Sequence, residues 1–213
     1  MKYKSFKDAD KIVNRSNYIV NNAKENKNNW SKFFGNNNPI HLELGMGRGD
    51  FIINMAKQNP KVNFVGVEIS DDQLVKAVQK LNNQNLPNLA LICMDANDLD
   101  NVFGKEIDTI YLTFSEPWPK KHDERKRFTH VGYLKLYDKI FKKNKHIILK
   151  TDNKGLFQYS LESLSQYWYV FDKVSLDLHN DEDPVKNNVM TDWEKKCVQD
   201  RKPIYYVDAS FNG

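Results

Sequence analysis

Cysteine is scarce in this 213-residue chain, and the little that is present excludes the common kinds of cysteine site. Cys93 and Cys197 are far apart in the sequence and lack the paired spacing of a zinc site or a redox motif. The five histidines form no ligand constellation along the sequence. We therefore expect no metal site, and we assign no catalytic role to a histidine.

Long apolar runs are also lacking. No segment approaches the length needed to span a bilayer, and the first residues, MKYKSFKDADK, have no apolar core of the kind found in signal peptides. We therefore expect no membrane association and a cytoplasmic location. Arginine is scarce, and the net charge of +4 (32 basic minus 28 acidic residues) is too small to establish nucleic-acid binding.

The pattern of apolar residues divides the chain in two. Residues 1–38 are polar and basic with scattered aromatic residues, which predicts a loosely held, partly disordered arm with one short helix. In residues 39–213, short apolar runs alternate with longer amphipathic segments, as in β-α units around a largely parallel sheet. We expect strands at 40–44, 63–69, 88–94, 107–114 and 146–151, and helices at 49–58, 71–82, 129–142 and 154–166.

The alternation stops after these segments. Two further strand-like runs, 169–178 and 203–211, flank an acidic, polar connection, and we expect them to form an antiparallel hairpin at one edge of the sheet. The resulting seven-stranded, mostly parallel α/β fold is Rossmann-like. The antiparallel hairpin at the end of the chain favours a class I methyltransferase over a dinucleotide dehydrogenase.

The first strand runs into a glycine-rich turn, ELGMGRG, at 43–49. Glycines at alternate positions, beginning with Gly45 and Gly47, let the backbone turn sharply and approach a ligand closely. The third glycine comes one residue too early for a pyrophosphate-binding loop. Glu43 would also repel a pyrophosphate, whereas it can receive the ammonium group of a methionine moiety. The turn therefore favours S-adenosylmethionine over NAD.

Two further acids follow the next strands. Glu68 lies 19 residues beyond Gly49, the spacing at which a carboxylate accepts hydrogen bonds from ribose hydroxyls. Asp95 follows the third strand and is placed to reach an adenine amino group. The alternative is that both acids merely end their strands, as surface carboxylates often do.

The fourth strand runs into the segment FSEPWPKK at 114–121. Ligands of open α/β sheets bind beyond the carboxyl ends of the strands, so this loop should face the reacting group. Its two prolines stiffen it, and Trp118 offers a flat surface to the core or to a nucleobase. Residues 120–127 hold five Lys or Arg, which suits a phosphate backbone but is equally common on solvated surfaces.

Together these segments resemble the bacterial tRNA (guanine-N7-)-methyltransferase family (TrmB), over nearly all the chain from Asn38 onward. The Pro-Trp-Pro-Lys loop is the specific signature. The resemblance rests on ELGMGRG (43–49), GVEIS (66–70), MDA (94–96), FSEPWPKK (114–121), KTDN (150–153) and VMTDWEKK (189–196). It implies S-adenosylmethionine as cofactor and a guanosine of tRNA, in the variable loop, as substrate.

The resemblance also implies roles for individual residues. It places Glu43, Gly45, Gly47, Glu68, Asp95 and Glu116 at the cofactor, with Glu116 as the catalytic residue. Contacts to the substrate guanosine are implied for Lys120, Asp152, Thr191 and Glu194. Contacts to RNA are implied for His122, Arg125, Lys126 and Arg127.

The chain departs from the family pattern in two places. The family usually has Asp at the position of Glu116, so the carboxylate here extends one methylene further. The basic stretch is usually more basic than here, where the second Lys of the loop is followed by His122-Asp123-Glu124.

Guanine N7 carries a lone pair and no proton, so its attack on a sulfonium methyl needs no general base. Positioning should dominate, and we expect Glu116 to orient the reactants and stabilise the charge that the base acquires. Other roles remain open for two candidate segments. Thr191 and Glu194 also fit a helix capping box, and Asp152 also fits a helix N-cap.

Three other functions fit parts of the sequence. Another class I methyltransferase would use the glycine turn and Glu68 equally well, and a non-catalytic RNA-binding relative would keep the fold. A nicotinamide-dependent oxidoreductase is disfavoured by the glycine spacing and by Glu43. The sequence does not distinguish a monomer from a homodimer.

Overall fold

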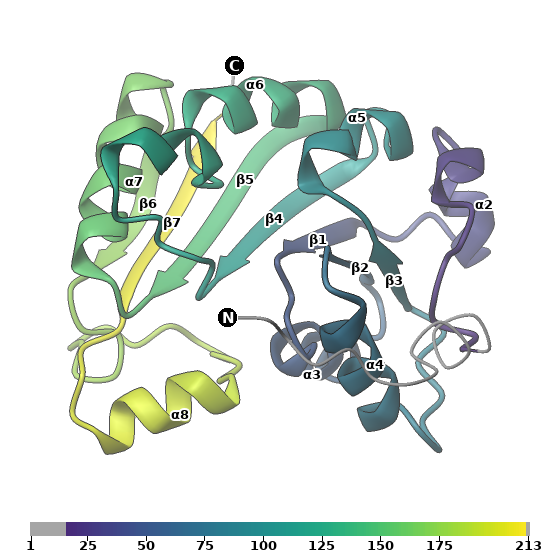
Figure 1. Ribbon diagram of the computed structural model, residues 1–213, viewed down its shortest axis with the longest axis horizontal. Helices are drawn as coiled ribbons and strands as arrows, with labels where there is room; N and C mark the ends of the chain where they lie inside the picture. Colours follow the sequence, from purple (N-terminus) through teal and green to yellow (C-terminus); the bar gives the residue numbers. More distant parts are fainter. Residues whose placement is uncertain (1–15, 212–213) are drawn as a thin grey trace.

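The protein is built around one twisted sheet, which Figure 1 shows with helices on both of its faces. The computed structural model describes residues 16–211. The strands run in the order β3-β2-β1-β4-β5-β7-β6, all parallel except β7, which lies antiparallel between β5 and β6. The predicted fold, with its C-terminal antiparallel pair, is confirmed. The strands are β1 (Ile40–Leu44), β2 (Asn63–Glu68), β3 (Leu89–Cys93), β4 (Ile107–Thr113), β5 (Phe141–Thr151), β6 (Val170–Ser175) and β7 (Tyr205–Phe211).

Helices and 3-10 turns connect the strands. They are η1 (Ala23–Asn26), α2 (Trp30–Phe34), α3 (Asp50–Gln58), α4 (Asp71–Lys80), η2 (Ala96–Asp98), α5 (Leu99–Val102), η3 (Lys121–Lys126), α6 (Val131–Ile140), α7 (Lys154–Gln166) and α8 (Asp192–Gln199). The helix predicted at 129–142 is too long at both ends, because His130 caps its start and β5 begins directly after its end. The reason is Phe141, which is buried and already pairs with Ile107 of β4. None of the helices among residues 16–211 has the length and apolarity that a membrane span requires.

Apolar side chains bury both faces of the sheet. On one face, β1, β4, β5 and β7 pack with α6 and α7 in a large cluster that includes Leu134, Tyr137 and Phe157. On the other, α3 and α4 cover β2 and β3 through residues such as Ile52 and Leu74. Every residue of β2 is buried, as expected for a central parallel strand with helices on both sides.

The N-terminal arm is held to the domain from residue 16 onward, unlike the loose arm that the sequence predicted. Trp30 is fully buried, stacks on Phe103 with ring centroids 5.2 Å apart and donates its indole N–H to the carbonyl oxygen of Val102. The carboxylate of Glu106 accepts the backbone N–H groups of Asn28 and Trp30. The predicted disorder at the start of the arm concerns residues that include 1–15, and these lie outside the described residues.

The parallel arrangement brings the carboxyl ends of β1, β4 and β5 to one edge of the sheet. In Figure 1, β4 and β5 run toward α8 at this edge. Thr113, the last residue of β4, pairs with Lys150 near the end of β5. The predicted glycine turn, the Pro-Trp-Pro-Lys loop and the Lys-Thr-Asp-Asn segment therefore all start from the same side of the fold.

Candidate active site

The glycine turn between β1 and α3 depends on backbone angles that favour glycine. Gly45, Gly47 and Gly49 all have positive φ, at 68°, 54° and 71°. The N–H groups of Gly45 and Met46 both donate to the carbonyl oxygen of Val67, which ties the turn to the end of β2. A Cβ added to Gly47 would meet no atom within 4 Å. The turn is thus tightly held, and its Gly47 side is open to a ligand.

Glu43 lies beneath this turn with an unsatisfied carboxylate oxygen. The side chain is 1% exposed. Its Oε1 accepts a hydrogen bond from the hydroxyl of Thr113, whereas no described residue donates to its buried Oε2. Burial raises the pKa of Glu43 to about 8, although the Thr113 bond and the nearby Lys150 lower it. A buried acceptor without a donor is rare in proteins, and a cationic ligand group would supply the missing partner.

Glu68 organises the same turn from the end of β2. Its carboxylate accepts three backbone N–H groups, from Gly47 at 2.9 Å and from Ile69 and Ser70 at 3.0 Å each. An ionised carboxylate has about four acceptor positions, so these bonds leave capacity for a hydroxyl donor. Glu68 therefore shapes the glycine turn in addition to its predicted role as a ribose ligand.

Asp95 follows the end of β3, as Glu68 ends the neighbouring strand β2. Its Oδ1 accepts the backbone N–H and the side-chain amide of Asn97, both at 2.8 Å, and caps the short turn η2. This capping role differs from the alternative left open for Asp95, that it merely ends its strand as a surface carboxylate. Its contact to an adenine amino group stays a prediction.

The loop after β4 contains two aromatic residues with strained backbones. Phe114 and Trp118 have φ of 52° and 44°, a region that bulky residues seldom occupy. Arg127 holds this conformation, because its Nε and Nη2 donate to the carbonyl oxygen of Trp118 at 3.3 and 3.0 Å. The guanidinium also lies 4.3 Å from the ring centroid of Tyr159. Strain of this kind persists only where surrounding contacts impose it, and it is frequent at functional sites.

Glu116 projects from the middle of this loop. It is exposed, and among residues 16–211 it takes part in no hydrogen bond or ion pair. Lys120, at the end of the loop, is exposed as well. The loop therefore presents one carboxylate and one ammonium group to an incoming partner from a backbone that Arg127 fixes.

The basic run from 120 to 127 is less positive than its composition indicates. Asp123 pairs with Lys126 at 2.7 Å and with His122 at 3.3 Å, and the Lys126 bond lowers the pKa of Asp123. Arg127 is directed to the Trp118 carbonyl. Of the residues predicted to contact RNA, His122, Arg125 and Lys126 are exposed, whereas Arg127 supports the loop.

Thr191 and Glu194 form the capping box that the sequence allowed. The Thr191 hydroxyl accepts the N–H of Glu194 at 2.9 Å, and the Glu194 carboxylate accepts the N–H of Thr191. Glu194 is fully buried, and its carboxylate also contacts Lys150 at 2.6 Å and His179 at 3.0 Å. In this structure both predicted substrate contacts face inward, toward the end of β5.

Asp152 occupies a different position. The N-cap of α7 is Asn153, whose side chain accepts the N–H of Leu156 at 2.8 Å, so the alternative role of Asp152 as the cap is wrong. Asp152 is half-buried and lies close enough to Cys197 to raise the pKa of that thiol, after the larger effect of burial. Its carboxylate is thus placed between the end of β5 and α8.

Sequence reasoning missed Lys150, Thr113 and Arg127. A lysine inside the apolar run HIILKT was a visible signal for Lys150, because a buried ammonium group needs partners. Thr113 gave no signal, since threonine is common in strands. Arg127 was assigned to RNA through the basic run and not to the loop that it supports.

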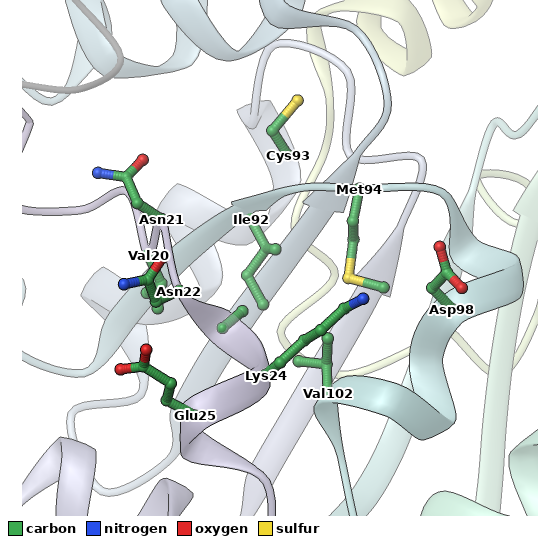
Figure 2. A pocket seen from close by; sticks show the side chains of 11 residues that line it. Val20, Asn21, Asn22, Lys24, Glu25, Ile92, Cys93, Met94, Asp98 and Val102 are labelled. Carbon is green, nitrogen blue, oxygen red and sulfur yellow. The ribbon is translucent and has the colours of Figure 1, made fainter.

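A cavity of about 360 Å³ lies elsewhere, between the N-terminal arm and β3. Figure 2 shows Asn22 and Glu25 of the arm on its left and Met94 on its right, with the side chain of Lys24 extending past Val102 toward Met94. Neither the glycine turn nor the loop after β4 contributes a residue to its lining. The candidate active site is the strand-end region described above, not this cavity.

Comparison with known proteins agrees with this geometry. Residues 37–207 match the family described as "Putative methyltransferase". A tRNA (guanine-N(7)-)-methyltransferase of Geobacillus sp. (strain WCH70) is 44% identical over 203 residues, which cover 95% of this chain and 91% of the relative. The tRNA (guanine-N(7)-)-methyltransferase of Streptococcus suis (strain 05ZYH33) is 43% identical over 213 residues. These cover 99% of this chain and 100% of the relative.

A solved structure shares the fold. An antibiotic-related methyltransferase superposes with a TM-score of 0.67 at 19% identity and covers 91% of this chain and 96% of its own. The match to the family and the identity to full-length relatives are both far above what a shared fold alone requires. The chain therefore belongs to the tRNA (guanine-N7-)-methyltransferase family.

Proposed function

We propose that this protein transfers the methyl group of S-adenosylmethionine to N7 of a guanosine in tRNA, located in the variable loop. The observation that carries the proposal is the link between Glu43 and Thr113. This hydrogen bond joins the buried carboxylate beneath the glycine turn to the residue that precedes the Pro-Trp-Pro-Lys loop. The candidate cofactor site and the family-specific loop therefore adjoin each other.

The residues at the strand ends fit the cofactor. The unsatisfied Oε2 of Glu43 would accept from its ammonium group, and Glu68 and Asp95 would take the ribose and adenine. The turn at Gly45 and Gly47 would lie along its methionine part, for which the open Cβ position of Gly47 leaves room. When bound, S-adenosylmethionine supplies an electrophilic methyl group on a positively charged sulfur. Because Glu43 is buried, the attraction between its carboxylate and an ammonium group is stronger than it would be in water.

The loop after β4 would position the base. Guanine N7 needs no proton removed, so the reaction requires alignment and stabilisation of the positive charge that the ring gains. Glu116 would align the base and stabilise this charge, and Arg127 holds the backbone of the loop that carries it. Lys120 and Asp152 would contact the guanosine directly. Thr191 and Glu194, which face inward, would act through the position of α8.

Exposed basic side chains next to the loop would hold the RNA. Lys121, His122, Arg125 and Lys126 are exposed on η3. Phosphate contacts of this kind position a nucleic acid without reading its sequence. The choice of guanosine then rests with the loop and its neighbours, not with η3.

The experiment is incubation of the full chain with labelled S-adenosylmethionine and unmodified tRNA, followed by chain scission specific for 7-methylguanosine. We expect labelled tRNA that is cut at one guanosine. Label without scission would mean that another atom is methylated. Absence of label would favour a non-catalytic RNA-binding relative.

A further inference from the structure

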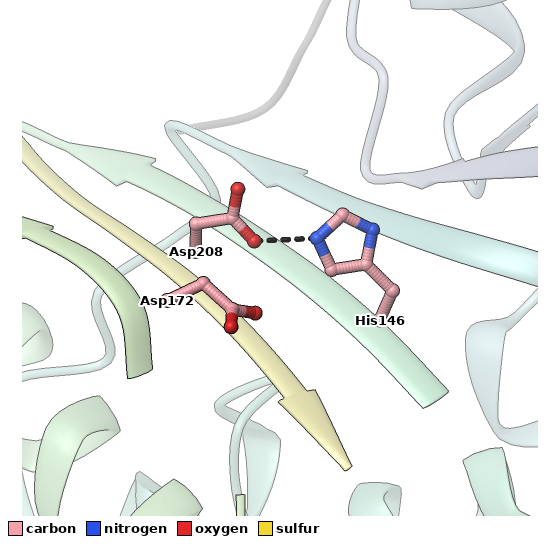
Figure 3. Close-up of side chains that lie close together, drawn as sticks. All are labelled: His146, Asp172 and Asp208. Atoms are coloured by element: carbon pink, nitrogen blue, oxygen red, sulfur yellow. Dashed lines mark hydrogen bonds and ion pairs between the residues drawn. The ribbon is translucent and has the colours of Figure 1, made fainter. Parts of the chain in front are cut away.

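Three polar side chains converge on the sheet surface away from the candidate active site. His146 on β5, Asp172 on β6 and Asp208 on β7 each offer one ligand atom, and these atoms all lie within 4.8 Å of one another. Figure 3 shows both carboxylates directed toward the imidazole ring. The side chains of His146 and Asp208 are 32% and 24% exposed, so an ion can reach them from solvent.

Asp172 owes its position to an irregularity of the edge strand. In the pairing of β6 with β7, Phe171 lies opposite Ala209 and Lys173 lies opposite Asp208. Asp172 is therefore an extra residue with no residue of β7 opposite it. Such a β-bulge redirects the side chain at its position. Here it turns the Asp172 carboxylate toward the two other donors instead of leaving it at the sheet edge.

Groups outside the cluster orient two of its members. The Thr109 hydroxyl lies 3.2 Å from Nδ1 of His146, and the Tyr206 hydroxyl donates to Oδ2 of Asp208 at 3.4 Å. Metal-binding histidines and carboxylates usually have such hydrogen bonds, which fix the ring orientation and leave the ligand atom available. When an ion displaces the proton from Nε2, the ring holds its remaining proton on Nδ1 toward Thr109, and the lone pair of Nε2 binds the ion between Asp208 and Asp172.

We propose that His146, Asp172 and Asp208 bind one divalent cation of the zinc class. One imidazole nitrogen and two carboxylate oxygens suit this class, and water completes the coordination. The ion replaces the hydrogen bond between Nε2 of His146 and Asp208. It joins three neighbouring strands and fastens the edge strand β6 to the sheet. This site is independent of the methyl transfer, since none of its ligands belongs to the candidate active site.

The test is titration of the metal-free full chain with zinc chloride by calorimetry. We expect one site per chain, and affinity at least tenfold weaker in Asp172→Asn and in Asp208→Asn. Asp183→Asn is the matched control, because Asp183 is an exposed carboxylate on the segment that follows β6. Its affinity should equal that of the wild type. Absence of saturable binding, or equal affinity in all three variants, would overturn the proposal.

A second measurement does not depend on the variants. Two-dimensional NMR of the histidine ring nitrogens, recorded during the same titration, should show a shift of Nε2 of His146 at one equivalent of zinc. The ring nitrogens of His122, which pairs with Asp123 within η3, should not change at that ratio. A shift of His122 before His146 would contradict the assignment.

Discussion

The ammonium group of Lys150 lies 2.6 Å from Oε2 of Glu194, and both side chains are buried almost completely. Lys150 also donates to the carbonyl oxygen of Val189 at 2.7 Å and to Oδ1 of Asn188 at 3.1 Å. A single side chain at the end of β5 thus fastens α8 and the segment before it to the sheet. Glu43 is close enough for Lys150 to lower its pKa, so this contact borders the cofactor site.

Replacement of Lys150 by Met should therefore destabilise the fold. The substitution leaves the Glu194 carboxylate buried without its cation, which typically costs about 3–5 kcal/mol. The measurement is urea unfolding of both proteins. Lys139→Met is the control, because the Lys139–Asp100 pair lies at the surface and should contribute no more than about 1 kcal/mol. Equal losses in the two variants would contradict the account.

Glu43 should make the folded protein less stable as pH rises. Its folded pKa is raised, so the folded state holds the proton more tightly than the unfolded chain. This contribution to stability is fully present below the unfolded pKa and is lost as pH rises through the folded value of about 8. Glu43→Gln keeps a neutral side chain throughout and should show a flatter profile.

The measurement for Glu43 is the free energy of unfolding of wild type and Glu43→Gln between about pH 5 and pH 8. Glu162→Gln, on the exposed side of α7, is the control and should follow the wild type. Binding of S-adenosylmethionine to Glu43→Gln should weaken at least tenfold, because the partner of the ammonium group is gone. Parallel pH profiles for wild type and Glu43→Gln would refute the role of burial.

Arg127 should matter for the rate more than for cofactor binding. Arg127→Lys keeps the charge but cannot make both hydrogen bonds to the Trp118 carbonyl, so the loop should relax from its strained form. We expect kcat to fall by about tenfold to a hundredfold, as small errors in position do, with the KM for S-adenosylmethionine unchanged. Arg201→Lys, an exposed arginine after α8, serves as the control.

The exposed residues of η3 should act through salt-dependent contacts. Lys121→Gln and Arg125→Gln should each lower the slope of log affinity for tRNA against log salt by about one. The affinity for S-adenosylmethionine should not change. Lys57→Gln, at the exposed end of α3, should leave the slope as in the wild type. If all three variants behave alike, η3 does not contact the RNA backbone.

Glu116 can be tested with two substitutions. Glu116→Gln keeps the shape and removes the charge, so single-turnover methyl transfer should slow by about a hundredfold, the cost of losing one preorganised electrostatic contact. Glu116→Asp restores the residue usual in the family and should stay active. Wild-type rates in Glu116→Gln would show that the charge has no role in the transfer.

Much of the fold was predictable because buried parallel strands appear in the sequence as short continuous apolar runs. The buried run of β2 and the glycines around Gly47 follow from residues that are neighbours in the sequence. The family-specific loop at 114–121 is likewise continuous in the sequence. Its place at a strand end followed from the general rule for open α/β sheets.

The rest depends on contacts between distant segments. The pairing of Lys150 with Glu194 joins residues 44 positions apart, and the His146–Asp208 contact joins residues 62 apart. The sequence gives no sign that β7 inserts between β5 and β6, which is what places Asp208 beside His146. The ordered part of the N-terminal arm was missed for the same reason, since Trp30 packs on Phe103.

The central claim is tested most directly by mass spectrometry of the nucleosides released from tRNA after reaction with the full chain and S-adenosylmethionine. The account predicts one new methylated nucleoside, 7-methylguanosine, and none in a reaction without the protein. A methyl group on any other atom of guanosine, or on another nucleoside, would contradict it.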